Sequence, residues 1–304
     1  MTTALLFPGQ GSQFVGMARD VYDALPPARD LIRQADKILG YKLSPLMFEG
    51  REDELTATAN AQPAIFTASL ALLRCFDLPR DVAFAAGHSV GEYSALVAAG
   101  SMSFEDALRL VQERGRLMHQ AGTDTPGGML AVLGLDDAAI EEACASVAPL
   151  VVCAANYNAP EQTIVSGEEA GLEAATEALK ARGAKRVLRL KVSAAFHSPV
   201  MARAAVELRA DIDRVRICAP RWPVVGNVST RPLTTETAIR EELAEQIASP
   251  VRWEASIRTM LAGGADRFIE IGPGKVLTGM LKRIEPAVSA ENVSDLESLR
   301  RCSP

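Results

Sequence analysis

One stretch of the chain joins a buried strand, a sharp turn and a helix within twenty residues, and it limits the possible folds most. It reads DVAFAAGHSVGEYSALVAAG and spans residues 81–100. The apolar run DVAFAA predicts a buried parallel strand, and the segment from Ser89 to Gly100 predicts a helix. The GHSVG between them has the G-x-S-x-G form of a nucleophile elbow, which exposes a serine hydroxyl at a helix N-terminus. The short motif alone also fits a plain structural turn, but the strand and helix around it favour a nucleophilic Ser89.

The remaining pattern alternates strands and helices, with one segment of different character. The run ALLF predicts a strand at residues 4–7, and Ser103 with Asp106 predicts the start of a helix that ends near Gln120. Residues 127–192 then follow the order βαββαβ of a ferredoxin-like unit. Helices expected near residues 199–213, 235–248 and 253–263 restore the α/β pattern. We therefore expect an α/β fold whose large subdomain, residues 1–123 and 192–304, contains a small α+β insert at residues 124–191.

Composition excludes several classes of function. The 304 residues carry a net charge of −6, which argues against a nucleic-acid partner. No apolar run approaches the roughly 18 residues of a membrane span, and the N-terminus MTTALLFPGQ lacks the basic segment of a secretory signal. The five cysteines form no C-x-x-C pair, which favours a reducing compartment and predicts no metal site. A cytoplasmic location is the expectation.

A nucleophilic serine needs a base, and the chain has only three histidines. His88 adjoins Ser89 at the strand end, where neighbouring side chains point different ways, so we expect it to pack beneath the elbow. His119 lies near the end of a predicted helix, where a solvated histidine is the ordinary interpretation. His197, in SAAFHSPVM, lies in an irregular stretch before a predicted helix and is the candidate base. With 38 acidic residues, spacing selects no orienting group, and a main-chain carbonyl is an alternative.

A second glycine-rich stretch, FPGQGSQ, follows the first predicted strand at residues 7–13. It fails as a dinucleotide fingerprint because position 14 is Phe rather than Gly. Its main-chain N–H groups are candidates for half of an oxyanion hole, and a structural turn is the alternative.

Taken together, the motifs resemble one family over nearly the whole chain, from about residue 4 to residue 281. In order they read FPGQGSQ, TANAQPAIFTASL, GHSVGEYSALVAAG, VQERGRLM, NYNAPEQTIVSG, AAFHSP and SPVRW. They are similar to the malonyl-CoA:acyl carrier protein transacylases of bacterial type II fatty acid synthesis and to the acyltransferase domains of polyketide and fatty acid synthases. The resemblance implies a hydrolase-like large subdomain with a parallel sheet and an inserted ferredoxin-like small subdomain.

The resemblance also implies roles for individual residues. Ser89 matches the acylated nucleophile and His197 the catalytic histidine. Arg114, the first arginine of ERGR, matches the residue that binds the free carboxylate of a malonyl group, for which a guanidinium is well suited. The other implied site residues are Gln10 and Val90 (oxyanion N–H groups), Gln62 (beside the arginine), Asn156 and Gln162 (substrate cleft) and Ser249 (a main-chain carbonyl that orients the histidine). Ser249 stands where family members often carry Asn.

The residues before the histidine bear on the acyl group. AAFH, residues 194–197, resembles the HAFH form of malonyl-selective enzymes more than the YASH form of methylmalonyl enzymes. Phe196 would crowd an α-methyl group, although one methyl group is worth only about 1–3 kcal/mol of discrimination. Ala194 stands in place of the first His of that pattern.

The resemblance implies that the chain transfers a malonyl group from malonyl-CoA to the phosphopantetheine thiol of acyl carrier protein through an acyl-serine, with no metal or redox cofactor. A monomer is expected. The alternatives are a free-standing acyltransferase of a polyketide pathway and an acyl-hydrolase with the same Ser-His pair. A binding module without catalysis is a further alternative, which intact Ser89, His197 and Arg114 disfavour.

One basic run stands out in this acidic chain. Residues 180–191, KARGAKRVLRLK, hold six basic side chains and no acidic one. Because carrier proteins are typically acidic, the run is a candidate for steering their docking. A solvated helix end and strand face is the alternative.

Overall fold

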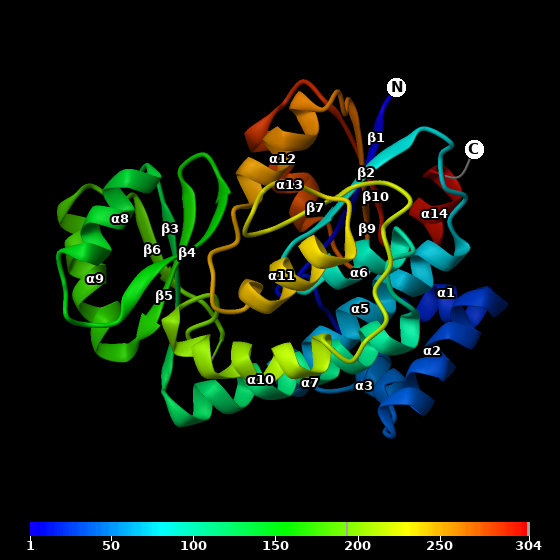
Figure 1. The fold of residues 1–304 in the computed structure, drawn as a ribbon, viewed down its shortest axis with the longest axis horizontal. Helices are drawn as coiled ribbons and strands as arrows, with labels where there is room; N and C mark the ends of the chain where they lie inside the picture. The colour runs from blue at the N-terminus through cyan, green and yellow to red at the C-terminus, as the bar shows by residue number, and fades with distance from the viewer. Residues whose placement is uncertain (193, 303–304) are drawn as a thin grey trace.

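Two sheets organise the chain, one parallel and one antiparallel (Figure 1). The structure is a computed structural model that describes residues 1–192 and 194–302; residues 193 and 303–304 of the expected large subdomain lie outside the described part. The strands are β1 (Thr3–Phe7), β2 (Val82–Gly87), β3 (Gly127–Leu133), β4 (Val152–Ala159), β5 (Gln162–Glu168), β6 (Arg186–Arg189), β7 (Val224–Val225), β8 (Pro232–Leu233), β9 (Arg267–Ile271) and β10 (Ser289–Val293).

Helices separate most of these strands. They are α1 (Arg19–Ala24), α2 (Pro26–Leu39), α3 (Leu43–Glu49), α4 (Glu52–Thr56), α5 (Thr58–Cys75), α6 (Gly91–Ala98), α7 (Phe104–Asp124), α8 (Asp137–Ala145), α9 (Glu169–Ala181), the 3₁₀ helix η1 (Pro199–Met201), α10 (Ala202–Ile212), α11 (Glu236–Gln246), α12 (Trp253–Ala262), α13 (Val276–Ile284) and α14 (Leu296–Cys302). In the described residues, no helix is both long enough and apolar enough to cross a membrane.

The six-stranded sheet has the order β10-β9-β1-β2-β7-β8, and all its neighbours are parallel except β7 and β8. Both faces of its central strand β1 are buried. Leu5 and Phe7 join the core formed with α2, α5 and α7, whereas Ala4 and Leu6 join a second core with α12 and α13. A strand covered on both faces needs an uninterrupted apolar run, and the run ALLF, from which the strand was predicted, meets this need.

The four-stranded sheet, with the order β4-β5-β3-β6, is antiparallel and forms the small subdomain. Its elements follow the sequence order β3, α8, β4, β5, α9, β6, which confirms the ferredoxin-like expectation. α8 and α9 cover this sheet at the far side of the molecule from α1 and α14 (Figure 1). The expected subdomain limits, 1–123, 124–191 and 192–304, stay a prediction.

α7 begins where its capping residue predicts and ends later than expected. Ser103 accepts a hydrogen bond from the Asp106 N–H at 3.0 Å, so the predicted start is confirmed. The helix continues to Asp124, four residues beyond the expected Gln120. Ala121 packs against the large core and Gly122 is buried, so the helix stays in contact with the core beyond its predicted end.

Candidate active site

The loops after β1, β2 and β7 converge at the carboxyl edge of the large sheet, where α/β folds commonly bind ligands. The turn after β2 is a nucleophile elbow in its geometry. Ser89 has a left-handed φ of 52°, and α6 begins two residues later. A Cβ at Gly87 would lie 2.0 Å from the Gly91 carbonyl carbon, and one at Gly91 would lie 2.2 Å from the Phe7 oxygen. Only glycine permits these approaches, so the two glycines of the motif shape the turn.

Ser89 and His197 form a hydrogen-bonded pair, with the Ser89 Oγ 2.8 Å from the His197 Nε2. On its other side, the His197 Nδ1 lies 3.0 Å from the Gln246 carbonyl oxygen and 3.1 Å from the Ser249 carbonyl oxygen. Carbonyls only accept hydrogen bonds, so they fix the tautomer with the proton on Nδ1 and leave Nε2 as an acceptor for the serine proton. The expected carbonyl of Ser249 is in place, and that of Gln246 is a second partner.

The surroundings of His197 keep the ring neutral. Burial, and next the nearby Arg114 guanidinium, lower its pKa to about 3. The residue is only 3% exposed. A neutral imidazole at physiological pH is the form that a general base requires.

Arg114 lies within the same site rather than on the surface, where a helix arginine is usually found. It is completely buried, and its Nη2 donates to the Ser89 Oγ at 3.0 Å and to the Gln246 Oε1 at 2.9 Å. Its Nη1 donates to the Gln62 Oε1 at 2.7 Å, so the expected neighbour is present. These partners are neutral acceptors, and a buried guanidinium in such a setting is suited to an anionic group on the ligand.

The loop after β1 lies directly on the elbow. A Cβ at Gly9 would lie 2.4 Å from the His88 carbonyl oxygen. The two expected oxyanion donors, the main-chain N–H groups of Gln10 and Val90, donate no hydrogen bond to any described residue. Both groups are therefore free to bind a developing oxyanion beside Ser89.

A cleft of about 480 Å³ opens above the serine and the histidine. Its wall includes Phe196, Asn156 and Gln162, so the structure brings the three expected cleft residues together. Gln162 lies at the rim, where its Oε1 accepts a hydrogen bond from Arg283 at 3.0 Å. Because β4 and β5 supply Asn156 and Gln162, the small subdomain forms one side of the cleft.

The other two histidines lie outside the proton path, as expected. The His88 Nε2 lies 2.8 Å from the Asn158 Oδ1, and its ring packs against Trp253 with centroids 5.5 Å apart. Burial lowers the pKa of His88. His119 is exposed on α7.

Gln246 is a site residue that the sequence analysis missed. Its main-chain carbonyl accepts from His197, its side-chain oxygen accepts from Arg114, and its Nε2 donates to the Ser89 carbonyl at 3.0 Å and to Glu92. It is the last residue of α11, where helix carbonyls lack partners within the helix. A predicted helix end before SPVRW was the available signal for the carbonyl, whereas no sequence pattern marks the side chain.

Asn227, after β7, is a second missed residue. Its Oδ1 accepts from the Ser89 N–H at 2.7 Å, and its Nδ2 donates to the Gly87 carbonyl at 2.7 Å. The fully buried side chain thus spans the elbow and holds its left-handed turn. The segment GNVST has no motif that would have identified it.

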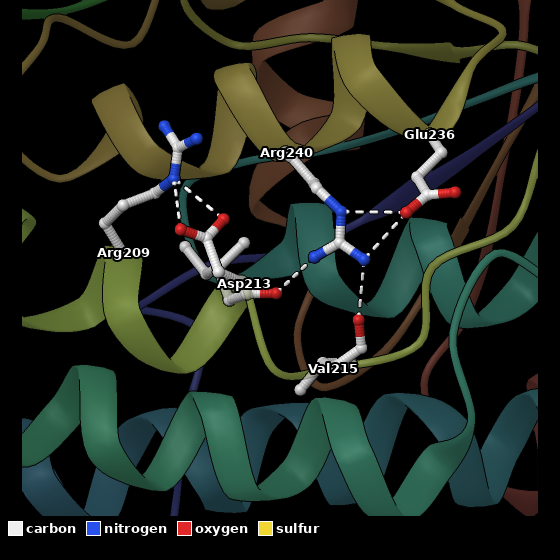
Figure 2. A network of polar contacts seen from close by, with 6 residues as sticks. Arg209, Asp213, Val215, Glu236 and Arg240 are labelled. Carbon is white, nitrogen blue, oxygen red and sulfur yellow. Dashed lines mark hydrogen bonds and ion pairs between the residues drawn. The ribbon is translucent and has the colours of Figure 1, made fainter.

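The position of Gln246 depends on how α11 is anchored to α10. Arg240 of α11 donates to the main-chain carbonyls of Ile212 and Val215, and it pairs with Glu236 (Figure 2). Its side chain is only 19% exposed. Arg240 therefore fixes α11 on the carbonyl end of α10, six residues before Gln246 along α11.

The comparisons with known proteins agree with this geometry. The family model of the acyl transferase domain matches residues 4–302. The chain is 46% identical over 301 residues to the malonyl CoA-acyl carrier protein transacylase of Bacillus subtilis (strain 168), covering 97% of this chain and 94% of that protein. It is 43% identical over 295 residues to the transacylase of the same name from Escherichia coli (strain K12), with 96% of each covered.

Solved structures extend the likeness to the whole fold. One is a malonyl-transacylase in complex with its type II PKS acyl-carrier protein, with a TM-score of 0.95, 40% identity, and 99% of this chain and 98% of that chain covered. Another is an acyl carrier protein S-malonyltransferase from Vibrio cholerae, with a TM-score of 0.93, 40% identity, and 99% of both chains covered. The chain belongs to the acyl transferase family and, within it, to the malonyl CoA-acyl carrier protein transacylases.

Proposed function

We propose that the chain transfers a malonyl group from malonyl-CoA to the phosphopantetheine thiol of an acyl carrier protein through a malonyl-Ser89 intermediate. One observation carries the choice of acyl group. The buried Arg114 guanidinium lies 3.0 Å from the nucleophilic oxygen, a position suited to the free carboxylate of a short acyl group attached to that oxygen. The names of the relatives and the structure solved with a carrier protein support the same donor and acceptor classes.

In the first half-reaction, the Ser89 Oγ attacks the thioester carbon while its proton moves to the His197 Nε2. The carbonyl oxygen becomes an oxyanion, which the N–H groups of Gln10 and Val90 stabilise. Collapse of this intermediate breaks the carbon–sulfur bond, and His197 returns the proton to the CoA sulfur. The products are malonyl-Ser89 and free CoA.

The second half-reaction reverses these steps with another thiol. The phosphopantetheine sulfur of the carrier protein loses its proton to His197 and attacks the acyl-serine carbon. The carbon–oxygen bond to Ser89 then breaks, and His197 returns the proton to the serine oxygen. The carrier protein supplies the thiol. This chain contributes only acid–base and nucleophilic groups to the proposed steps, which need no metal or redox cofactor.

All the groups in this scheme come from one chain. Ser89, His197, Arg114 and Gln246 are joined by hydrogen bonds without a second copy. A monomer is therefore our proposal for the active unit.

The basic run at residues 180–191 receives less support as a docking surface. Lys180, Lys185 and Arg189 pair with Glu177, Glu161 and Glu169 of the same chain. Lys191 differs from these three because it lines the cleft. We propose that any steering by this run comes mainly from Lys191.

The experiment that tests the function is acylation of Ser89 followed by intact mass spectrometry. We expect malonyl-CoA to add one malonyl group, a carrier protein with its phosphopantetheine arm to remove it as malonyl-carrier, and Ser89→Ala to stay unmodified. Rapid conversion to free malonate without a carrier would instead support the acyl-hydrolase. Parallel assays with fatty acid and type II polyketide carrier proteins distinguish the two pathways, since the chemistry at Ser89 is the same in both.

A further inference from the structure

Glu92 is a buried acidic residue that the transfer mechanism does not use. It lies in the first turn of α6, three residues after the nucleophile, and is completely buried. Its Oε2 accepts a hydrogen bond from the Gln246 Nε2, whereas its Oε1 has no hydrogen-bond partner among the described residues. A buried carboxyl with an unpartnered oxygen is poorly solvated as an anion, so its protonation state responds to nearby charge.

Gln246 connects this carboxyl to the arginine of the acyl site. Its Oε1 accepts from the Arg114 Nη2 at 2.9 Å, and its Nε2 donates to Glu92. One side-chain amide therefore separates the guanidinium from the nearest carboxyl in this chain of hydrogen bonds. The amide orientation depends on both ends, because Arg114 only donates and an ionised Glu92 only accepts.

The charged groups around Glu92 define its electrostatic setting. Burial, and next the Glu242 carboxylate of α11, raise the pKa of Glu92 well above its ordinary value. The hydrogen bonds from Gln246 and the Asn227 N–H and the charge of Arg114 lower this pKa, but by less. Glu242 is itself engaged by the N–H groups of Val228 and Ser229. Tyr93, the remaining titratable neighbour, has its pKa raised to about 12 mainly by burial and stays neutral. Glu92 is therefore the group in this cluster that is placed to titrate.

We propose that Glu92 is a proton-linked positioning residue: at alkaline pH its carboxylate faces Arg114 through Gln246 in the empty site, and it takes up a proton when a malonyl carboxylate occupies Arg114. The inference rests on the proposed function, because it needs an anionic acyl group on Arg114. Proton uptake leaves the net charge of the buried cluster unchanged when the ligand carboxylate arrives. Without it, a further uncompensated charge would be buried, which is costly.

The sign of the linkage follows from this scheme. A ligand that favours protonated Glu92 binds best at low pH and loses affinity as pH rises through the pKa of Glu92 in the empty site. The loss approaches about tenfold per pH unit for one linked proton. Glu92→Gln places a permanently neutral group of the same shape at this position. The affinity of this variant for malonyl-CoA should therefore stay near its low-pH limit at every pH.

The test measures the Kd of malonyl-CoA and acetyl-CoA by calorimetry from about pH 6 to about pH 9, in Ser89→Ala chains that bind but do not react. With Glu92 present, we expect malonyl-CoA to weaken with rising pH relative to acetyl-CoA, which carries the same phosphates but no free carboxylate. With Glu92→Gln, the two ligands should show parallel pH profiles. Glu270→Gln is the matched control. Glu270 is also a buried carboxyl with a raised pKa, but it accepts hydrogen bonds from Leu277 and Thr278, away from Arg114. In this control, the affinity for malonyl-CoA should still weaken with rising pH relative to acetyl-CoA.

Two outcomes overturn the inference: equal pH profiles for the two ligands when Glu92 is present, or a malonyl-specific slope that survives Glu92→Gln. The ligand comparison needs no change at Glu92, so it stands even where that variant folds poorly. Malonylation of Ser89 in the chain with an intact nucleophile is measured separately. Its absence would contradict the proposed function, whereas its presence without the pH linkage would contradict only the role of Glu92.

Discussion

At the scale of single residues, burial decides what the charged and titratable groups of the site do. Arg114 and His197 are both removed from water and both contact Ser89. A guanidinium stays charged under these conditions and an imidazole becomes neutral. Arg114 is thereby suited to bind an anion, and His197 is suited to act as a base.

Replacing Arg114 with alanine should change the choice of acyl group. We expect kcat/KM for malonyl-CoA to fall by at least about 100-fold, since a charge-assisted contact to the malonyl carboxylate is worth ~3 kcal/mol. Use of acetyl-CoA should be unchanged or improved. The control is Arg116→Ala, on the exposed face of the same helix and paired with Glu113. An unchanged malonyl/acetyl ratio in Arg114→Ala would refute the assigned role.

The pH dependence of Ser89 acylation should lack a titration near the ordinary pKa of histidine. Because burial and Arg114 lower the pKa of His197 to about 3, its base form persists well into acid. We expect the acid limb of kcat/KM for malonyl-CoA, which reports the free chain, to lie below about pH 5. Rapid-quench acylation in overlapping buffers measures it, and a half-maximal rate near pH 6.5, the ordinary histidine pKa, would show that His197 is less buried.

At the scale of elements, the elbow and α11 place the reacting groups. Two glycines shape the elbow and Asn227 spans it, whereas Arg240 ties α11 to the end of α10. Neither element contains the whole site. Each one positions a main-chain segment, and the main chain in turn positions Ser89 or the carbonyl that orients His197.

Gly91→Ala should abolish acylation and lower the free energy of unfolding. The new Cβ would lie 2.2 Å from the Phe7 oxygen, a main-chain atom that cannot move away easily. Gly279→Ala is the matched control, since it lies within α13, and a Cβ there meets nothing within 4 Å. The control should be stabilised by about 0.5–1 kcal/mol from helix propensity. Denaturant unfolding measures both variants; equal stability of the two would contradict the proposed backbone clash.

Arg240→Leu should destabilise the chain and also slow acylation. It removes hydrogen bonds to two carbonyls at the end of α10 and loosens the helix that carries Gln246 (Figure 2). We expect a loss of about 1–3 kcal/mol in the free energy of unfolding. Arg209→Ala, which breaks the exposed pair with Asp213 in the same view, should cost less than about 1 kcal/mol. If both variants unfold at the same denaturant concentration, Arg240 does not anchor α11.

At the scale of the whole molecule, the active site lies between the two subdomains. The large sheet supplies Ser89, and the strands β4 and β5 of the small subdomain supply the opposite wall with Asn156 and Gln162. His197 follows the last strand of the small subdomain, where the chain returns to the large one. A carrier protein that delivers its arm to Ser89 must therefore approach a surface that both subdomains form.

Charge reversal on the small subdomain should separate steering from ordinary surface pairing. Lys191→Glu, at the cleft, should raise the carrier-protein KM several-fold and reduce its dependence on salt, because it removes attraction along the approach. Lys185→Glu and Arg189→Glu should have smaller effects, since both residues are already paired with acidic side chains. Steady-state transfer at two ionic strengths measures the difference. An unchanged KM in all three variants would exclude docking by this run.

Local sequence alone was sufficient for the elbow, the βαββαβ order of the small subdomain and the start of α7. These depend on interactions between residues close in the chain: glycine sterics, alternating apolar runs and a capping side chain. Counting histidines selected His197 without any contact information. The resemblance to the transacylases then selected Arg114, since an arginine on a helix is otherwise expected at the surface.

Only the tertiary structure decided which groups meet at Ser89. Gln246 and Asn227 come from segments 157 and 138 residues away from the nucleophile, and their roles depend on hydrogen bonds across the fold. The same holds for the burial of Glu92 and the low pKa of His197, because desolvation is a property of packing and not of sequence neighbours. The sequence by itself determined the nucleophile and the fold around it, whereas packing decided how that nucleophile is oriented, charged and supplied with its acyl group.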